Sequence, residues 1–382
     1  MKDMEENVWI WGMGEGGKLL YHFLQEADVY KVKGLIDNAK EKRKQKYGNF
    51  IVLPFAEAVR NIKDNDLVVC CCPLSSYGEM KDALLSVSHN KYKHFYEMDL
   101  SGYTKRVVEN GAESRLVSRL CSVDDFGGNN FRRILKELGY AGEPIMHRKR
   151  WEWVYTIEVL EAYGMLQSGK SGIGFAVGTE PLPSYFASHG VKVLASDLAI
   201  GEENAESWRE SNQNAGGNIQ LLYKPELCAE TVFLQNVKYR NINMNHIPPD
   251  IGRYDFCWSS CAIEHVGSLA LSKRFLKNML GCLKPGGIAV HTTEFNLSSN
   301  ESTIESGDSV IFRKRDIEEM QGWFAGQGHM MEVSFKRSGK EGNNYIDIPP
   351  STGEGRPYHI SLAANGYAET SFAFVIRKSD ER

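Results

Sequence analysis

The stretch GFAVGTEPLPSYFASHGVKVLASDLA, residues 174–199, decides how the second half of the chain is interpreted. It has the pattern of a first strand that turns into a helix, followed by a second strand that ends at Asp197. Nucleotide-binding sheets fill such a turn with glycines, which let backbone amides approach a phosphate. Here the turn carries Glu180 and two prolines instead. We therefore expect a pocket at the edge of a sheet that holds a ligand without phosphate.

Strand and helix patterns alternate from Ser171, through this stretch, to the end of the chain. The strand-like runs are GIGFAVG, VKVLASD, VKYRNINM, YDFCWSS, GGIAVHTTE and TSFAFVIRK. This alternation predicts a parallel sheet with crossover helices. Ligands of open sheets bind at the carboxyl ends of the strands. One crevice is therefore expected between residues 178–180, 197, 243–244, 259–265 and 291–296.

The first hundred residues alternate in the same way and predict a smaller parallel sheet. After its first strand, the run GMGEGG places Gly12, Gly14 and Gly17 in G-x-G-x-x-G spacing. Asp37 ends the second strand. The glycines would admit a pyrophosphate and Asp37 would hold a ribose hydroxyl pair. The alternative is a purely structural domain.

Between the two sheets, residues 101–170 lose strand character and show helical periodicity. The sequence therefore predicts an α/β protein with two Rossmann-like open sheets. We expect a small N-terminal domain over 1–105, a helical bridge over 106–168 and a C-terminal domain over 169–382. Two domains agree with a length of 382 residues.

Composition excludes several classes of protein. Hydrophobic residues make up 42%, charged residues 25%, and the net charge is −4, so no bulk field attracts nucleic acid or anionic lipid. The N-terminus lacks a secretory signal, and the longest apolar run, LVVCCCPL, is too short to span a bilayer. We expect a cytoplasmic protein without membrane insertion. The sequence leaves the oligomeric state open, a homo-oligomer included.

The second domain resembles the class I S-adenosylmethionine-dependent methyltransferases. GFAVGTEPLP stands where that family has its glycine-rich turn, with Gly178 retained, and CLKPGGIAVHTTE matches the family's Lys-Pro-Gly-Gly turn into the fifth strand. The resemblance implies S-adenosylmethionine as cofactor. The cofactor-binding residues it implies are Gly178, Thr179, Glu180, Asp197, Asn243, Met244 and Ser260.

Within that set, Asp197 would hold the ribose and Glu180 would face the methionine ammonium group. Asn243 would contact the adenine amino group, with Met244 against the ring. The alternatives are a helix N-cap for Asp197 and an ordinary core position for Met244.

The sequence from about residue 145 to the end of the chain resembles a bacterial methyltransferase subgroup often encoded near glycan-assembly genes. The N-terminal text VWIWGMGEGGKLLYHFL resembles modules attached to bacterial sugar-modifying enzymes, which bind a nucleotide-sugar or serve only for docking. These resemblances imply O-methylation of a sugar or glycan-precursor hydroxyl, with a sugar-nucleotide or glycan substrate. The alternatives are a natural-product methyltransferase and an inactive methyltransferase-fold scaffold.

An alcohol acceptor must lose its proton to a base or to a metal that lowers its pKa. The candidates are Glu264 and His265 after the fourth strand, and His291 and Glu294 after the fifth. The run AIEHV also resembles the Glu-His element of metal-dependent methyltransferases, which leaves a divalent metal open, with Glu264, His265 and Glu294 as ligands. The alternative is that Glu264 supports a helix start and His265 is a satisfied, half-buried histidine.

The predicted helix RKRWEWVYTIEVLEAYGML supplies a second set of candidates. Arg148, Arg150 and Trp151 combine cationic and aromatic side chains, which suit sugar rings or phosphates. The alternative is a helix face with the tryptophan packed on the sheet.

Overall fold

The computed structural model of the protein describes residues 6–27, 29–100, 102, 106–142, 145–199, 201, 214–349 and 357–380. The chain forms two compact units. Unit 1 comprises Met1–Val107, Leu297–Ser299 and Asn344–Glu369, and unit 2 comprises Val108–Asn296, Asn300–Asn343 and Thr370–Arg382. Each unit contains its own open sheet, so the predicted α/β fold with two Rossmann-like sheets is confirmed. The predicted limits at 105 and 168 remain predictions.

Unit 1 contains a six-stranded sheet in the order β3-β4-β2-β1-β5-β6. Its strands are β1 (Glu6–Trp11), β2 (Tyr30–Ile36), β3 (Lys46–Tyr47), β4 (Phe50–Leu53), β5 (Leu67–Cys70) and β6 (Tyr92–His94). Its first helices are α1 (Glu15–Glu26), α2 (Phe55–Ala58) and α3 (Leu74–Ser86), followed by the short 3-10 helix η1 (Phe95–Glu97). β1 pairs in parallel with both β2 and β5, as the predicted β-α-β order requires.

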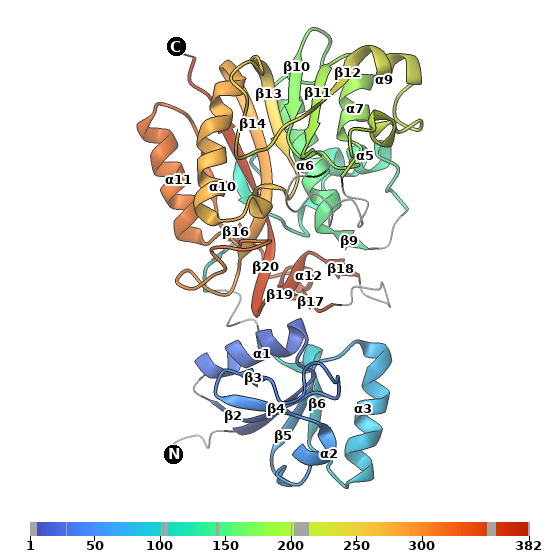
Figure 1. The fold of residues 1–382 in the computed structure, drawn as a ribbon, viewed down its shortest axis with the longest axis vertical. Coiled ribbons are helices and arrows are strands. Elements are labelled where there is room, and N and C mark those ends of the chain that lie inside the picture. The colour runs from blue at the N-terminus through green and yellow to red at the C-terminus, as the bar shows by residue number, and fades with distance from the viewer. Residues whose placement is uncertain are drawn as a thin grey trace. The chain divides into compact units, whose positions relative to one another are not determined.

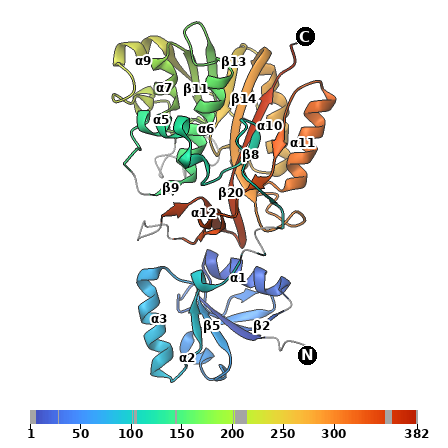
Figure 2. The same cartoon turned by 180° about the vertical axis from the view of Figure 1, so that it is seen from behind.

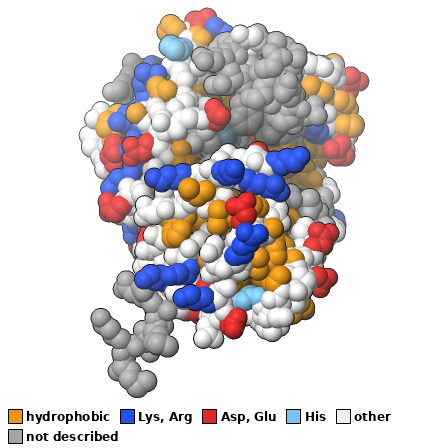
Figure 3. Space-filling view, turned by 60° about the horizontal axis from the view of Figure 1, so that its bottom comes forward, with side chains coloured by type: hydrophobic (Ala, Val, Ile, Leu, Met, Phe, Trp, Pro, Cys, Tyr) orange, Lys and Arg blue, Asp and Glu red, His pale blue; other side chains and the backbone are white. Residues whose placement is uncertain are grey.

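Apolar residues cover both faces of this sheet. α1 buries Leu19, Leu20 and Leu24. A separate cluster gathers around Trp9 and Trp11, with partly buried hydrophobic residues packed against it. On the face of unit 1 that Figure 3 presents, apolar side chains lie among Lys and Arg side chains.

A late segment of the chain also belongs to unit 1. It contains β17 (Ile346–Asp347), β18 (Tyr358–His359) and β19 (Ser361–Ala364), and β17 pairs in parallel with β19. It packs directly on α1, because a Cβ at Gly16 would lie 2.9 Å from Ile348 Cγ2, and the Asn365 amide donates to Glu15. The sequence analysis did not predict this association.

Unit 2 contains the larger sheet, and the two opposite views show helices on both of its faces (Figures 1 and 2). Six strands follow the order β12-β11-β10-β13-β14-β20. They are β10 (Ser171–Gly174), β11 (Lys192–Asp197), β12 (Val237–Asn241), β13 (Tyr254–Ser259), β14 (Leu283–Asn296) and β20 (Tyr367–Arg377), of which all but the start of β20 lies in unit 2. β10 pairs in parallel with β11 and with β13, so the strand order reverses at β10. Ligands of open sheets bind at such a switch point.

The other elements of unit 2 flank this sheet or extend it. The helices are α5 (Asn129–Glu137), α6 (Arg148–Ala162), α7 (Leu182–Ser188), α9 (Glu230–Asn236), α10 (Leu269–Asn278) and α11 (Lys314–Gly326), with α12 (Glu341–Asn344) at the unit boundary. The 3-10 helices are η2 (Asp125–Gly127), η3 (Ile219–Leu222), η4 (Ile263–His265) and η5 (Met279–Cys282). The short strands are β7 (Glu109–Asn110), β8 (Ser118–Leu120), β9 (Met146–His147), β15 (Val333–Ser334) and β16 (Lys336–Arg337).

The predicted bridge supplies α5 and α6 as expected, and also β8, which the sequence analysis did not predict. β8 pairs with β15 and with β20. Within the part of the chain that the structure describes, no helix is long and apolar enough to cross a membrane.

Candidate active site

A cavity of about 270 Å³ lies in unit 2, lined by residues that follow β10, β11, β12 and β13. Eight predicted site residues line it. They are Gly178, Thr179, Glu180, Asp197, Asn243, Met244, Ser260 and His265. The other predicted catalytic residues of this unit, Glu264, His291 and Glu294, are not among the residues that line it. The cavity also includes residues that sequence reasoning missed, among them Lys149, Trp153, Leu198, Ile242 and Asn245.

The turn after β10 has a strained backbone. Ala176 has a φ of 49° and Gly178 a φ of 54°, both in the left-handed region, which is unfavourable for a residue with a Cβ. Gly174 has another role, because a Cβ there would lie 2.4 Å from the Trp258 ring. Cys261, which also lines the cavity, has a φ of 47°. Strain of this kind concentrates at functional sites.

Asp197 lies at the end of β11 and is 5% exposed. Its carboxylate accepts hydrogen bonds from the Gly178 amide at 3.0 Å, the Leu198 amide at 2.8 Å and the Asn214 carboxamide at 3.3 Å. Burial raises the pKa of Asp197 to about 6, although these backbone donors favour the charged form. The Asp197 carboxylate therefore connects the turn after β10 to the end of β11, and it also lines the cavity.

Glu180 is a second buried carboxyl group in the cavity. It is 7% exposed, and its Oε1 accepts a hydrogen bond from Trp258 Nε1 at 2.6 Å. Burial raises the pKa of Glu180 to about 7, outweighing the hydrogen bond from Trp258. A cationic ligand next to this group would stabilise its charged form.

The part of the cavity that follows β12 combines apolar and amide side chains. Ile242 and Met244 are buried, while Asn243 Oδ1 accepts a hydrogen bond from the Asn245 amide at 2.9 Å. Asn245 Nδ2 donates to the Val266 carbonyl at 3.0 Å. Its Oδ1 is buried and accepts no hydrogen bond from the residues that the structure describes. An acceptor in this position suits a ligand that carries an N–H or O–H group.

One face of α6 contributes Lys149 and Trp153, which are four residues apart and thus one helical turn apart. Trp153 stacks on Tyr140, with ring centroids 5.9 Å apart. The Lys149 ammonium group lies 3.5 Å from Glu152 Oε2 and 3.5 Å from the Ser260 carbonyl oxygen. This face presents a cation and an aromatic ring to the cavity.

The three residues that the sequence analysis had selected from this helix do not line the cavity, which corrects that expectation. Trp151 is fully buried and donates to Asp125 at 2.7 Å. Arg150 donates to the Ile145 carbonyl and lies over the Tyr140 ring. Arg148 is paired with Glu294 at 2.8 Å.

Glu152, on the next face of α6, is fully buried behind the cavity. Its Oε1 accepts hydrogen bonds from Ser371 Oγ at 2.5 Å and Cys261 Sγ at 2.9 Å. Burial alone would raise the pKa of Glu152, but the charges of Lys149 and Arg148 outweigh this and lower it. The carboxylate therefore holds Lys149 and Cys261 in place at the cavity wall.

His265 is the predicted catalytic residue that reaches the cavity. Its Nδ1 lies 2.6 Å from the Asp308 carbonyl oxygen, and its Nε2 lies 3.9 Å from Glu264 Oε1. A carbonyl oxygen only accepts, so Nδ1 carries the proton and Nε2 of the neutral ring carries the lone pair. Glu264 is fully buried, and Thr293 donates to its Oε2 at 3.0 Å. Burial, and then the nearby charge of Glu294, raise the pKa of Glu264.

The two remaining catalytic candidates, His291 and Glu294, are held by other side chains of the protein and do not line the cavity. His291 is fully buried, contacts Phe275 and lies 2.8 Å from Ser259 Oγ through Nδ1. Burial lowers the pKa of His291 to about 3. Glu294 is held by Arg148 and by Ser309 Oγ at 3.1 Å. We therefore do not retain these two as proposed bases.

Metal binding gains no support from this arrangement. Across the described ranges, no group of three or more His, Cys, Asp or Glu side chains is arranged to hold a metal ion. Of the set Glu264, His265 and Glu294, His265 is the residue that lines the cavity, and Glu294 is paired with Arg148.

The glycine turn of unit 1 is tightly packed on its own backbone. A Cβ at Gly12 would lie 2.3 Å from the Cys71 carbonyl oxygen, and a Cβ at Gly17 would lie 1.9 Å from that of Gly12. At Gly14 the nearest atom is Lys42 Nζ at 4.0 Å. Asp37 accepts from the Met13 amide at 2.7 Å and pairs with Lys42 at 3.4 Å. Packing therefore explains Gly12 and Gly17, and leaves Gly14 as the position open to a ligand.

Comparison with known proteins gives a family match for unit 2. A family model described as a methyltransferase domain matches residues 173–291, the region that contains most of the cavity. A search of curated protein sequences gives no match.

Solved structures that are similar to the chain include three methyltransferases. One is phosphoethanolamine N-methyltransferase 2 of Haemonchus contortus in complex with S-adenosyl-L-methionine, at 12% identity and a TM-score of 0.34, covering 99% of this chain and 95% of that one. Another is a putative sarcosine dimethylglycine methyltransferase of Galdieria sulphuraria, at 13% identity and a TM-score of 0.33, covering 61% and 85%. A third is a SAM-dependent methyltransferase of Methanosarcina mazei, at 14% identity and a TM-score of 0.36, covering 58% and 98%.

Proposed function

We propose that the chain, whose residues 173–291 match a methyltransferase-domain family model, transfers the methyl group of S-adenosylmethionine to a hydroxyl group of a sugar or glycan precursor. The observation that carries this proposal is that His265, Trp153, Glu180 and Asp197 line one and the same cavity. It combines a base, an aromatic platform and two buried carboxyl groups. The resemblance of the N-terminal text to modules of sugar-modifying enzymes supports the same acceptor class.

The residues of the cavity fit the cofactor. Asp197 holds the ribose, because a buried carboxylate can accept from two neighbouring hydroxyl groups. Glu180 faces the methionine ammonium group, and a positive charge there offsets the cost of its burial. Asn243 and Met244, with the orphaned Asn245 Oδ1, form the adenine end. Gly178, Thr179 and Ser260 complete the wall.

S-adenosylmethionine supplies a methyl group that is already activated by its positively charged sulfur. The chain's own residues align the acceptor, exclude water and accept its proton. His265 accepts that proton at Nε2, since Nδ1 is held as a donor by the Asp308 carbonyl. Glu264, 3.9 Å from Nε2, stabilises the imidazolium ion that results. Both candidates follow β13, as expected from the sequence.

Side chains of α6 bind the acceptor. Trp153 offers a half-buried aromatic face supported by Tyr140, which suits the apolar face of a sugar ring. Lys149 offers a cation whose position is fixed by Glu152. Gly12, Gly14, Gly17 and Asp37 of unit 1 remain a proposed nucleotide or nucleotide-sugar site, with Gly14 as its open position.

The test combines cofactor binding with an acceptor screen. The wild-type protein is incubated with methyl-labelled S-adenosylmethionine and a panel of hexoses, uronic acids and nucleotide-sugars, and labelled products are analysed by mass spectrometry. We expect an O-methyl sugar, with kcat reduced on the order of a hundredfold or more in His265→Gln. The matched control is His246→Gln, because His246 is exposed and does not line the cavity.

Two results would contradict the proposal. One is a product methylated on nitrogen or carbon, and the other is an unchanged kcat in His265→Gln. A protein that binds S-adenosylmethionine but methylates no acceptor of any class would instead support the scaffold alternative.

A further inference from the structure

The segment 300–312, which follows β14, forms part of the surroundings of His265. Its backbone is hydrogen-bonded to the loop that begins with η4: the Val310 amide donates to the Glu264 carbonyl at 3.0 Å, and the Gly307 amide donates to that of Gly267 at 3.1 Å. The Leu269 amide donates to the Glu305 carbonyl at 2.9 Å. The segment therefore runs beside the loop that lines the cavity.

Two contacts connect this segment to His265 and to Glu294. The Asp308 carbonyl accepts from His265 Nδ1 at 2.6 Å, and Ser309 Oγ donates to Glu294 Oε2 at 3.1 Å. The first contact determines which ring nitrogen of His265 carries the proton. If the segment moves, the Nδ1–H form loses its partner and the opposite tautomer becomes accessible.

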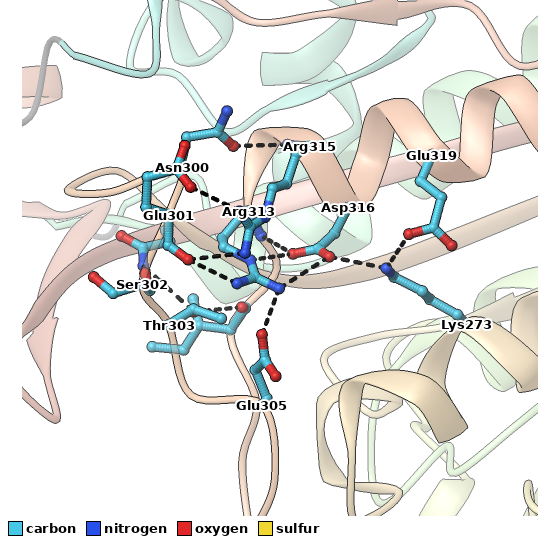
Figure 4. Close-up of polar contacts among 12 residues, drawn as sticks. Lys273, Asn300, Glu301, Ser302, Thr303, Glu305, Arg313, Arg315, Asp316 and Glu319 are labelled. Carbon is cyan, nitrogen blue, oxygen red and sulfur yellow. Dashed lines mark hydrogen bonds and ion pairs between the residues drawn. The ribbon is translucent and has the colours of Figure 1, made fainter.

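A buried arginine that directly follows the segment contacts its beginning and its middle (Figure 4). Arg313 is 5% exposed. Its Nη1 donates to the Glu301 carbonyl at 2.8 Å, and its Nη2 lies 2.7 Å from Glu305 Oε1. Its Nε donates to Asp316 Oδ2 at 2.7 Å. One guanidinium group thus joins the beginning and the middle of the segment to the first turn of α11.

Asp316 connects this arginine to a second helix. Lys273 of α10 donates to Asp316 Oδ1 at 2.9 Å and pairs with Glu319 at 2.5 Å. Burial alone would raise the pKa of Asp316, but the hydrogen bonds from Arg313 and Lys273 outweigh this and lower it. The charge of Arg313 is therefore fully compensated, and the anchor is fixed to α10 and α11, the helices after β13 and β14.

We propose that Arg313 is a positioning residue for methyl transfer, because it holds segment 300–312 so that the Asp308 carbonyl fixes the tautomer of His265. This rests on the proposed role of His265 as the base. Only a planar fork of donors serves all three acceptors at once, so lysine cannot replace arginine here. The effect reaches the reaction through Asp308 and His265, since Arg313 itself does not line the cavity.

The test uses Arg313→Lys in the full chain, with Arg377→Lys as the matched control, because Arg377 pairs with Asp380 outside this network. Nitrogen-15 NMR of the histidine side chains, with the His265 signals assigned through His265→Gln, reports the tautomer without any acceptor. We expect the Nδ1–H form in the wild type and in Arg377→Lys, and a mixture of both tautomers in Arg313→Lys. Affinity for S-adenosylmethionine should stay within about twofold of wild type, because Asp197 and Glu180 are not in contact with this network.

When an acceptor has been identified, kcat in Arg313→Lys should fall in proportion to the Nδ1–H form that is lost, about twofold for an equal mixture of tautomers, while KM for the cofactor is retained. A pure Nδ1–H signal in a folded Arg313→Lys protein would overturn the proposal. If that variant does not fold, Glu305→Gln removes one exposed ligand of the arginine and should cause a smaller shift in the same direction. A mixed tautomer together with full activity in His265→Gln would instead sink the role of His265 as base.

Discussion

In each of the two units, an aspartate after the second strand is hydrogen-bonded to the turn after the first strand, but the two aspartates have different neighbours. In unit 1, Asp37 after the second strand accepts from the Met13 amide at 2.7 Å, and in unit 2, Asp197 accepts from the Gly178 amide at 3.0 Å. Each carboxylate therefore fastens the turn after the first strand. Asp37 is compensated by Lys42 at 3.4 Å, whereas Asp197 is held by amide donors and faces a cavity.

The difference teaches that a complete glycine motif is not the stronger sign of a ligand site. Gly12 and Gly17 are required because other backbone atoms occupy the space that a Cβ would need. The turn of unit 2 has fewer glycines, yet Ala176 adopts the left-handed conformation that a glycine would adopt without strain. The left-handed backbone conformation therefore occurs at the cavity although the glycine motif is incomplete there.

The largest expected effect separates the two carboxylates. Asp197→Asn should weaken binding of S-adenosylmethionine on the order of a hundredfold, because a charged acceptor for two hydroxyl groups is lost. Asp37→Asn should leave that affinity unchanged. Isothermal titration calorimetry measures both, with circular dichroism to verify folding. Equal losses in the two variants would break the comparison.

Sequence predicted one side of the cavity well, and for a local reason. Asp197, Asn243 and Ser260 follow the ends of consecutive strands, and parallel strands bring their carboxyl ends to one edge. The alternation of strands and helices alone therefore placed these residues together. It also predicted both sheets.

The opposite side of the cavity depends on the rotation of α6, which sequence could not give. This helix buries Trp151, Glu152, Val154 and Tyr155 as well as residues further along, so it has no single apolar stripe from which its orientation can be read. The sequence pattern consequently favoured Arg148, Arg150 and Trp151, while Lys149 and Trp153 line the cavity. β14 posed the same problem, because both of its faces are buried and the side on which His291 lies was not readable.

Long-range packing was also beyond the sequence pattern. The contacts of Ile348 with Gly16 and of Asn365 with Glu15 join positions more than three hundred residues apart. Arg313 likewise serves the site through segment 300–312, which does not belong to any recognised motif. Such contacts require the assembled fold.

A smaller effect tests the packing of the unit 1 turn. Gly17→Ala should lower the free energy of unfolding by about 2 kcal/mol, because its Cβ would lie 1.9 Å from the Gly12 carbonyl oxygen. Gly14→Ala is the control and should change it by less than about 0.5 kcal/mol, since the space beside Gly14 is open. Denaturant unfolding followed by fluorescence measures both, with Trp9 and Trp11 as probes within the unit. A similar loss in both variants would show that Gly14 is also required by packing.

The smallest effect concerns the pH dependence of cofactor binding. Burial raises the pKa of Glu180 to about 7 and that of Asp197 to about 6, so both are partly protonated in mildly acidic solution. A raised carboxyl pKa stabilises the ligand-free fold below the unfolded pKa, and this contribution is lost as pH rises through the folded value. A cationic ligand requires the ionised form, so its affinity should change in the opposite direction and rise about tenfold between pH 5.5 and 7.5.

Calorimetry across that range should show this rise in the wild type and a much flatter profile in Glu180→Gln. Glu158→Gln is the matched control, because burial also raises the pKa of Glu158 to about 7 but this group does not line the cavity. If both variants flatten the profile equally, the pH dependence of the affinity comes from the net charge of the protein and not from contact between Glu180 and the ligand. A profile that falls with pH in the wild type would place an anionic group of the ligand against Glu180 and would reverse the proposed orientation of the cofactor in the cavity.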